Sequence, residues 1–141
     1  MQLKVKRIHP KSIVPRYAQV GDAGLDLYSI QYDIIKPNER LLIPTGLAIE
    51  LPPNTEAQIR PRSGLALKHG ISVLNSPGTI DSGYRGEVGV ILINHGTEDF
   101  VITPGMKIAQ MVIAPYFIVK TVEAELSDSQ RCQGGFGSTG Y

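Results

Sequence analysis

The sequence predicts an all-β protein with a jelly-roll sandwich or barrel of many short strands, one short helix and a flexible glycine-rich C-terminal tail. Fifteen glycines and ten prolines divide the chain into short runs. Within these runs apolar and polar residues alternate, as where Leu47 and Ile49 flank Ala48. Alternation with a period of two is typical of half-buried strands, and many short strands at regular spacing favour a sandwich or jelly roll.

The expected elements follow one another along the chain. Strands are expected over residues 3–5, 25–30, 40–43, 47–51, 57–60, 71–74, 88–94, 100–102, 107–113 and 118–124. The helix is expected over residues 64–69, where Ser63 is placed to cap its start and Gly70 to end it. Residues 75–86 are expected to form a β-hairpin with a turn near Ser82 and Gly83.

The length of 141 residues fits one domain of ordinary size. We expect residues 1–126 to form the jelly-roll domain. Residues 127–141 start with a polar segment and continue into a glycine-rich one, so they are expected to form the flexible tail that closes over an active site.

Composition excludes several classes of protein. The formal charge is +1, with 14 basic and 13 acidic residues spread along the chain, so a nucleic-acid groove is not expected. The single cysteine, Cys132, excludes an internal disulfide and a cysteine-based zinc site, and the three histidines lack ligand spacing. No apolar run reaches membrane-spanning length, and the N-terminus does not resemble a signal or transit peptide. We expect a cytoplasmic protein with no membrane partner.

The tail sequence RCQGGFGSTG is suited to binding a phosphate chain. Its glycines allow backbone N–H groups to converge on an anion, while Arg131 adds a guanidinium and Ser138 and Thr139 add hydroxyl groups. Phe136 has no local apolar partner, and a nucleobase would provide one. Taken alone, such a composition is more often typical of plain disorder, and it is the other segments of the sequence that favour a binding role.

Upstream segments carry further polar groups. Arg62, Ser63 and Gly64 lie where a strand end opens the helix, which suits phosphate, although an N-capped turn with a surface arginine is the alternative. Asp26 lies in an alternating strand and could be a solvated residue. Gln110 lies in an otherwise apolar strand, where a buried amide needs partners, a ligand among them.

The stretch from Asn75 to Gly86 would expose backbone edges able to hydrogen-bond a base. Asp81 and Tyr84 lie beside its turn, and each could have a purely structural role instead. Asp81 could initiate the turn, and Tyr84 could pack against a residue on the neighbouring strand. The sequence lacks a Walker loop, a G-x-S-x-G elbow and a promising Ser, His and Asp set. What remains is a carboxylate to activate water and several donors for phosphate oxygens.

Five segments resemble, in order and spacing, the five motifs of the homotrimeric dUTPase family: AGLDL, PRSG, GTIDSGYRG, GMKIAQM and RCQGGFGSTG. The resemblance covers residues 23–140. It implies a hydrolase that converts dUTP to dUMP and pyrophosphate by water attack at the α-phosphorus, which limits uracil in DNA and supplies dUMP for dTMP synthesis. It also implies a homotrimer with three active sites at subunit junctions.

The resemblance implies a role for each matched position. Asp81 orients or deprotonates the attacking water, Gln110 lies at the α-phosphate or its water, and Tyr84 lies beneath the deoxyribose, where a ribose 2′-hydroxyl has no space. Asp26 supports the site. The remaining substrate contacts are Asn75, Thr79, Ile80, Gly89 and Phe136 for the uracil, and Arg62, Ser63, Gly64, Arg131, Gly137, Ser138 and Thr139 for the phosphates.

Mg²⁺ is expected to travel with the triphosphate, held by phosphate oxygens and water, because the sequence has no cluster of carboxylates to ligate it directly. One departure from the family is Cys132, which stands where the tail usually has glycine; a positive φ there would cost about 1 kcal/mol. Two alternatives stay open: a non-catalytic trimeric nucleotide-binding or regulatory relative, and a dCTP deaminase-type enzyme.

Overall fold

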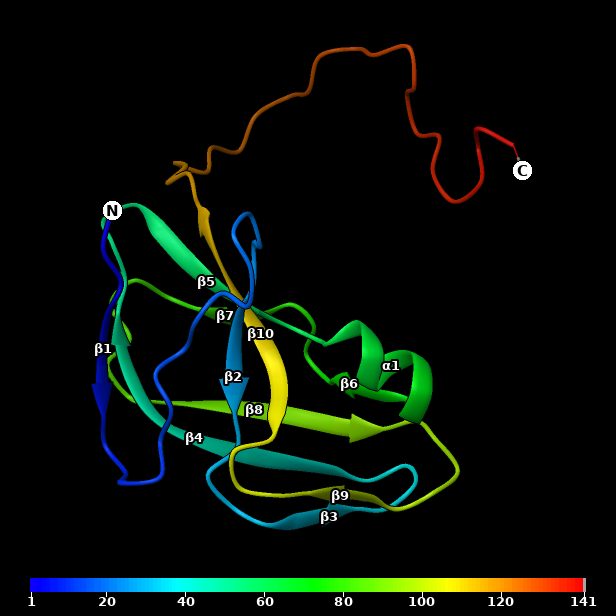
Figure 1. The fold of residues 1–141 in the computed structure, drawn as a ribbon. Coiled ribbons are helices and arrows are strands. Elements are labelled where there is room, and N and C mark those ends of the chain that lie inside the picture. The colour runs from blue at the N-terminus through cyan, green and yellow to red at the C-terminus, as the bar shows by residue number, and fades with distance from the viewer. Residues whose placement is uncertain (141) are drawn as a thin grey trace.

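Two four-stranded antiparallel sheets and a two-stranded sheet make up the body of the molecule (Figure 1). The structure is a computed structural model, and it describes residues 1–140; Tyr141, the last residue of the expected tail, lies outside the described residues. The elements are β1 (Lys4–Arg7), β2 (Leu25–Tyr28), β3 (Asp33–Ile35), β4 (Arg40–Glu50), β5 (Thr55–Arg60), α1 (Ser63–His69), β6 (Ile71–Val73), β7 (Gly78–Ile80), β8 (Glu87–Asn94), β9 (Phe100–Ile102) and β10 (Lys107–Pro115).

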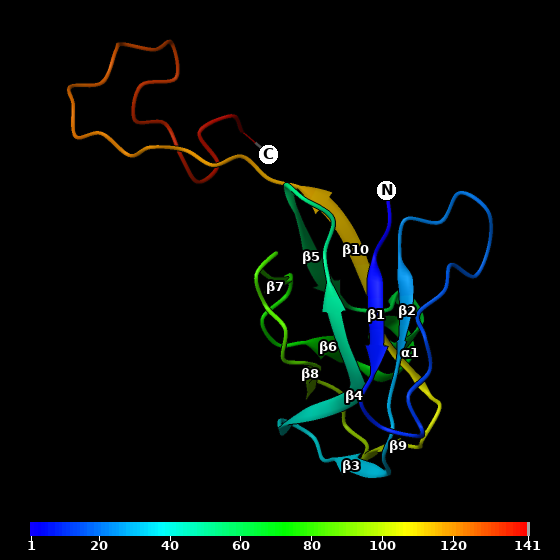
Figure 2. The same ribbon diagram turned by 90° about the vertical axis from the view of Figure 1, so that its left-hand side faces the viewer.

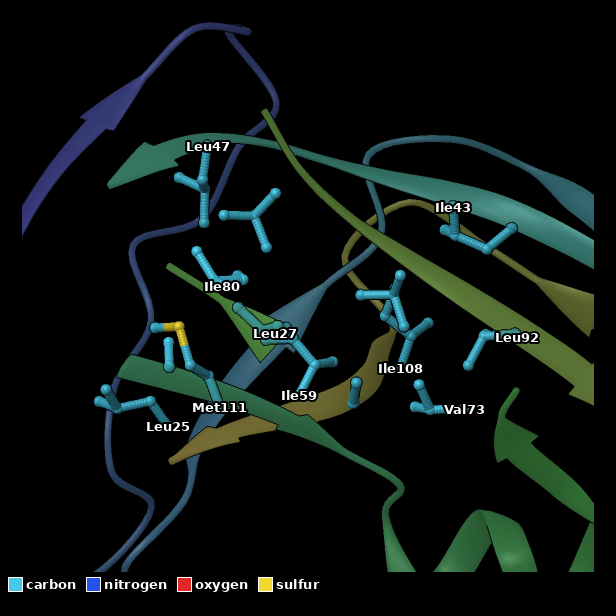
Figure 3. Packing of buried hydrophobic residues seen from close by; sticks show 14 of the residues in the cluster. Leu25, Leu27, Ile43, Leu47, Ile59, Val73, Ile80, Leu92, Ile108 and Met111 are labelled. Carbon is cyan, nitrogen blue, oxygen red and sulfur yellow. The ribbon is translucent and has the colours of Figure 1, made fainter. Parts of the chain in front are cut away.

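The strand order is β1-β4-β8-β6 in one sheet and β2-β10-β5-β7 in the other, with β3 pairing β9 separately. The core lies between the two larger sheets (Figure 3). Leu27 and Met111 from the second sheet and Ile43 and Leu92 from the first are fully buried. Along β8 every second residue is buried, as the alternation predicts. The all-β fold with one short helix is confirmed.

Several local predictions differ from the structure. The runs over residues 40–43 and 47–51 form the single strand β4, whose register against β8 shifts between Pro44 and Ala48. Strand β3 was not expected, because its three residues carry too short a pattern. Among residues 1–140, the segment over residues 118–124 forms no strand and pairs with no other strand. Ser63 does not cap α1, since Arg62 occupies the N-cap position and makes no side-chain cap hydrogen bond.

The stretch over residues 75–86 forms a turn between two sheets instead of a paired hairpin. Strand β7 pairs with β5, whereas β8 pairs with β4 and β6. The turn itself lies where expected, because the backbone N–H of Tyr84 donates to the carbonyl of Asp81 at 3.0 Å. Gly70 ends α1 as expected, with a φ of 68° and its N–H donating to helix carbonyls.

After β10 the chain leaves the body and extends away from it, as both views show (Figures 1 and 2). Residues 116–140 contain no helix or strand. Within the described residues, no helix combines the length and the apolar character needed to cross a membrane.

Candidate active site

Three of the segments singled out in the sequence meet in one row across the second sheet. Strand β10 lies between β2 and β5, and its Gln110 is opposite Asp26 on one side and Arg60 on the other. The chain then turns from β5 into α1, which places Arg62 next to this row. The fold therefore gathers residues that are distant in sequence at one end of three neighbouring strands.

A cavity of about 350 Å³ opens at this place. Its lining includes all five residues predicted there, namely Asp26, Arg62, Ser63, Gly64 and Gln110, together with Ala18, Asp22, Ala23, Gly24, Arg60 and Val112. The first turn of a helix leaves backbone N–H groups without an intrahelical partner, so the start of α1 adds donors to the guanidinium groups. Donors and positive charge around one cavity favour an anionic ligand.

Asp26 is buried, with 8% of its surface exposed, so the alternative of a solvated strand residue is wrong. Its two carboxylate oxygens face two different cations. Arg62 Nε lies 3.3 Å from Oδ1, and Lys107 Nζ lies 2.6 Å from Oδ2. The hydrogen bond from Lys107 to Asp26 raises the pKa of that lysine above its ordinary value of 10.5. Lys107 was not among the predicted site residues.

The amide of Gln110 is half-buried and oriented by its neighbours. Its Nε2 donates to the carbonyl of Pro61 at 2.9 Å, which ties β10 to the segment that carries Arg62. Gly24 makes room for this side chain, because a Cβ atom at Gly24 would lie 2.2 Å from Gln110 Oε1. The expectation that a polar group in this apolar strand needs a partner is confirmed, and the partner is a backbone carbonyl.

A second cavity, of about 180 Å³, lies at the turn between β7 and β8. It is lined by the predicted residues Thr79, Ile80, Asp81, Tyr84 and Gly89, together with Glu87 and Val88. Strand β7 pairs only with β5, so its other edge leaves backbone donors and acceptors unpaired beside this cavity. Asp81 is exposed there, and it is the only carboxylate besides Glu87 among the lining residues.

The ring of Tyr84 is held in place by its hydroxyl group, which donates to the carbonyl of Glu87 at 3.0 Å. Gly86 permits this placement, because a Cβ atom there would lie 2.5 Å from the Tyr84 hydroxyl. Tyr84 lies in the turn between β7 and β8 and in neither strand, so it is not paired across strands. Asn75 is not among the residues that line the cavity; its side chain lies against Gly78 instead.

The two cavities lie at opposite ends of β5 within one chain. Ile80 is opposite Ala57 near the start of β5, whereas Arg62 follows its end. At about 3.3 Å per residue, the strand separates Asp81 from Arg62 by roughly 20 Å. Within one chain, the predicted catalytic carboxylate thus lies far from the predicted phosphate-binding cavity.

The tail residues Arg131, Phe136, Gly137, Ser138 and Thr139 line neither cavity. They are exposed, and the hydrogen bonds of this segment are local, such as that from Arg131 Nε to the carbonyl of Gly134 at 2.9 Å. Cys132 has a φ of 46°, in the left-handed region, where a Cβ atom costs about 1 kcal/mol.

Among residues 1–140, no group of three or more histidine, cysteine, aspartate or glutamate side chains is arranged to hold a metal ion. The single buried carboxylate of the first cavity, Asp26, already faces two cations. The residues that line the first cavity therefore do not supply the several oxygen ligands that direct binding of Mg²⁺ requires.

Comparison with known proteins identifies relatives over nearly the whole chain. The model of the dUTPase family matches residues 10–140. Deoxyuridine 5′-triphosphate nucleotidohydrolase from Gloeothece citriformis is 63% identical over 141 residues, which cover 99% of this chain and 97% of that protein. The protein of the same name from Clostridium kluyveri is 63% identical over 142 residues, covering 99% of both chains.

Solved structures have the same fold. The dUTPase of Staphylococcus bacteriophage 80alpha, in a structure with dUPNHPP, superposes with a TM-score of 0.90 at 27% sequence identity. The superposition covers 99% of each chain.

Proposed function

Because this chain belongs to the dUTPase family, we propose that it hydrolyses dUTP to dUMP and pyrophosphate. The observation that carries the proposal is the clustering of Asp26, Arg62, Ser63, Gly64 and Gln110 around one cavity, which brings three separate segments of the family resemblance together. The relatives at 63% identity carry the name deoxyuridine 5′-triphosphate nucleotidohydrolase, and they match essentially the whole chain.

In the proposed reaction, water attacks the α-phosphorus and the bond between the α-phosphorus and its bridging oxygen breaks. Asp81 orients this water or accepts its proton, the role of a general base. Arg62, Ser63 and Gly64 bind the phosphate oxygens and stabilise the departing pyrophosphate, while Gln110 contacts the α-phosphate or the water. The expected acceleration of the reaction comes from positioning of the reactants and stabilisation of charge, because no covalent nucleophile is involved.

The second cavity is the proposed site of the nucleoside. The unpaired edge of β7 and the backbone near Gly89 would read the uracil, with Asn75 beside them. Tyr84, fixed by its hydrogen bond to Glu87, would lie against the deoxyribose and leave no room for a 2′-hydroxyl. Close packing at carbon 5 of the base would exclude the methyl group of thymine.

The tail is proposed to close over the bound nucleotide. Phe136 would stack on the uracil, while Arg131, Gly137, Ser138 and Thr139 would bind the outer phosphates and exclude water. Residues 127–141 are accordingly proposed as a mobile lid on the domain of residues 1–126. Mg²⁺ is proposed to be bound by phosphate oxygens and water, and it would neutralise part of the triphosphate charge. We propose a cytoplasmic location, in which the exposed Cys132 thiol stays reduced.

A homotrimer with sites shared between subunits is proposed for two reasons. First, the roughly 20 Å between Asp81 and Arg62 along β5 calls for these two residues of one site to come from different chains. Second, the segment after β10 exposes large apolar side chains, including Phe117 at 91% and Ile118 at 85%. Contact with another copy of the chain would cover this apolar surface.

The sharing of active sites between subunits is tested with two variants, Asp81→Asn and Arg62→Ala. The two variants are mixed, unfolded and refolded together. Each variant alone should be nearly inactive, whereas mixed assemblies should regain activity because some sites receive both native residues. Activity in the mixture no higher than the sum of the separate variants would exclude shared sites.

The substrate proposal is tested by measuring pyrophosphate release from dUTP, dCTP, dTTP and UTP in parallel, with Mg²⁺ and then with chelator. We expect release from dUTP alone, and less of it with chelator. Ammonia from dCTP would instead identify a deaminase, and no release from any nucleotide would identify a non-catalytic relative.

A further inference from the structure

Lys107 is a cation that the proposed reaction has not yet used, although it is in direct contact with Asp26, which lines the proposed phosphate-binding cavity. Its Nζ lies 2.6 Å from Asp26 Oδ2, closer than Arg62 Nε lies to the other oxygen. The carboxylate side chain is only 11% exposed, whereas that of Lys107 is 38% exposed. A carboxylate shielded from water in this way needs charged or hydrogen-bonding partners, and Lys107 provides the shorter of its two contacts.

A β-bulge is what brings Lys107 to this place. Lys107 is opposite Tyr28 and Gln110 is opposite Asp26, with a register shift between Lys107 and Ala109. Residues three apart on a regular strand point to opposite faces of the sheet. The extra residue in the bulge places Lys107 and Gln110 on the same face, beside Asp26. The fold thus departs from regular pairing at the point where this contact is made.

The charges around Asp26 indicate what the contact does. If Asp26 had Arg62 as its only partner, the pair would be neutral, and the carboxylate would repel a phosphate that approached the guanidinium. With Lys107 present, one negative charge faces two positive charges. Lys107 is fully charged at neutral pH, since its hydrogen bond to Asp26 raises its pKa above 10.5.

We propose that Lys107 is a positioning residue for the phosphate chain: it neutralises and fixes Asp26, so that Arg62 is held in place while its positive charge remains available to the substrate. The inference rests on the proposed dUTP hydrolysis. It assigns to Lys107 an effect on phosphate affinity that is transmitted through Asp26, without contact between Lys107 and the substrate.

The test compares Lys107→Met with the wild-type protein in steady-state turnover of dUTP and in calorimetric binding of inorganic pyrophosphate. We expect KM to rise about tenfold and pyrophosphate affinity to fall by a similar factor, with kcat changed less than about threefold. Lys107→Arg keeps the charge and should restore values within about threefold of wild type. A matched control is Lys4→Met, which removes a lysine that also lies 2.6 Å from a carboxylate, that of Glu50, outside the cavity; it should change neither quantity.

A double-mutant cycle distinguishes action through Asp26 from direct contact. In the Asp26→Asn background, Lys107→Met should change KM and pyrophosphate affinity by less than about twofold, because the charge that Lys107 balances is gone. An equal effect in both backgrounds would overturn the inference, as would wild-type KM and affinity in Lys107→Met.

Failure of the variant to fold and failure of the wild-type protein to hydrolyse dUTP can both be distinguished from failure of the inference. If thermal unfolding shows that Lys107→Met does not fold, Lys107→Gln replaces it, since it loses the charge but keeps a polar side chain, and the same outcomes apply. If the wild-type protein does not turn over dUTP, the proposed function fails, and the pyrophosphate affinities alone then support or overturn the role of Lys107.

Discussion

Replacing Gly24 with alanine tests whether the orientation of Gln110 matters for the cavity. The new Cβ atom would lie 2.2 Å from Gln110 Oε1 and 3.1 Å from its Cβ and Cδ atoms, so the amide must move. It would then lose its hydrogen bond to the Pro61 carbonyl. The loss of one such bond costs about 0.5–1.5 kcal/mol, and an off-rotamer side chain costs about as much again.

We therefore expect Gly24→Ala to destabilise the protein by about 1–3 kcal/mol, or roughly 3–10 °C in Tm at fixed protein concentration. We also expect kcat/KM for dUTP to fall at least about tenfold, because the segment that carries Arg62 loses its tie to β10. Thermal unfolding and steady-state kinetics measure the two effects.

Gly83→Ala is the matched control, since no heavy atom lies within 4 Å of its Cβ position. It should retain nearly wild-type stability and activity. In a Gln110→Ala background, Gly24→Ala should lose most of its effect, because the atom it displaces is absent. If Gly24→Ala behaves like Gly83→Ala, or is equally harmful without the Gln110 amide, the reasoning is wrong.

Three other predictions follow from the site. Asp81→Asn should lower turnover by roughly a hundredfold to ten-thousandfold with nucleotide affinity largely kept, as measured by kinetics and calorimetry; near-normal turnover would remove Asp81 from its role. Deleting residues 131–141 should abolish most turnover while leaving Tm unchanged, because residues 131–140 are exposed; a lower Tm would make the tail part of the folded body. Because the pKa of Lys107 is raised in the folded protein, its stabilising contribution is fully present below pH 10.5 and is lost as pH rises through the folded pKa. Wild-type Tm should thus fall more steeply than that of Lys107→Arg above pH 10.5, and parallel curves would contradict this.

The alternation of apolar residues allowed the strands and the fold class to be predicted, because burial on one face of a sheet imposes a period of two. It did not reveal which strands pair. Residues 75–86 read as a local hairpin, yet β7 and β8 pair with different partners in different sheets, since long-range packing determined the pairing. Residues 118–124 carry a strand pattern, yet no strand among residues 1–140 pairs with them.

The predicted groups of the site were visible as polar residues in apolar surroundings, which is why Asp26 and Gln110 could be selected. Lys107 was missed because only the bulge in β10 brings it to the face of Asp26, and regular spacing would place it away from Gln110. The burial of Asp26 and its contact with Arg62, which indicate that further charged partners are needed, are visible only in the structure. Gly24 and Gly86 were missed because their contribution is the space they leave for Gln110 and Tyr84.

Hydrolysis of dUTP in water enriched in ¹⁸O shows which phosphorus atom the water attacks. Attack at the α-phosphorus predicts that dUMP and pyrophosphate are the products and that the label enters dUMP alone. Label in pyrophosphate, release of orthophosphate, or no hydrolysis at all would exclude the proposed attack at the α-phosphorus.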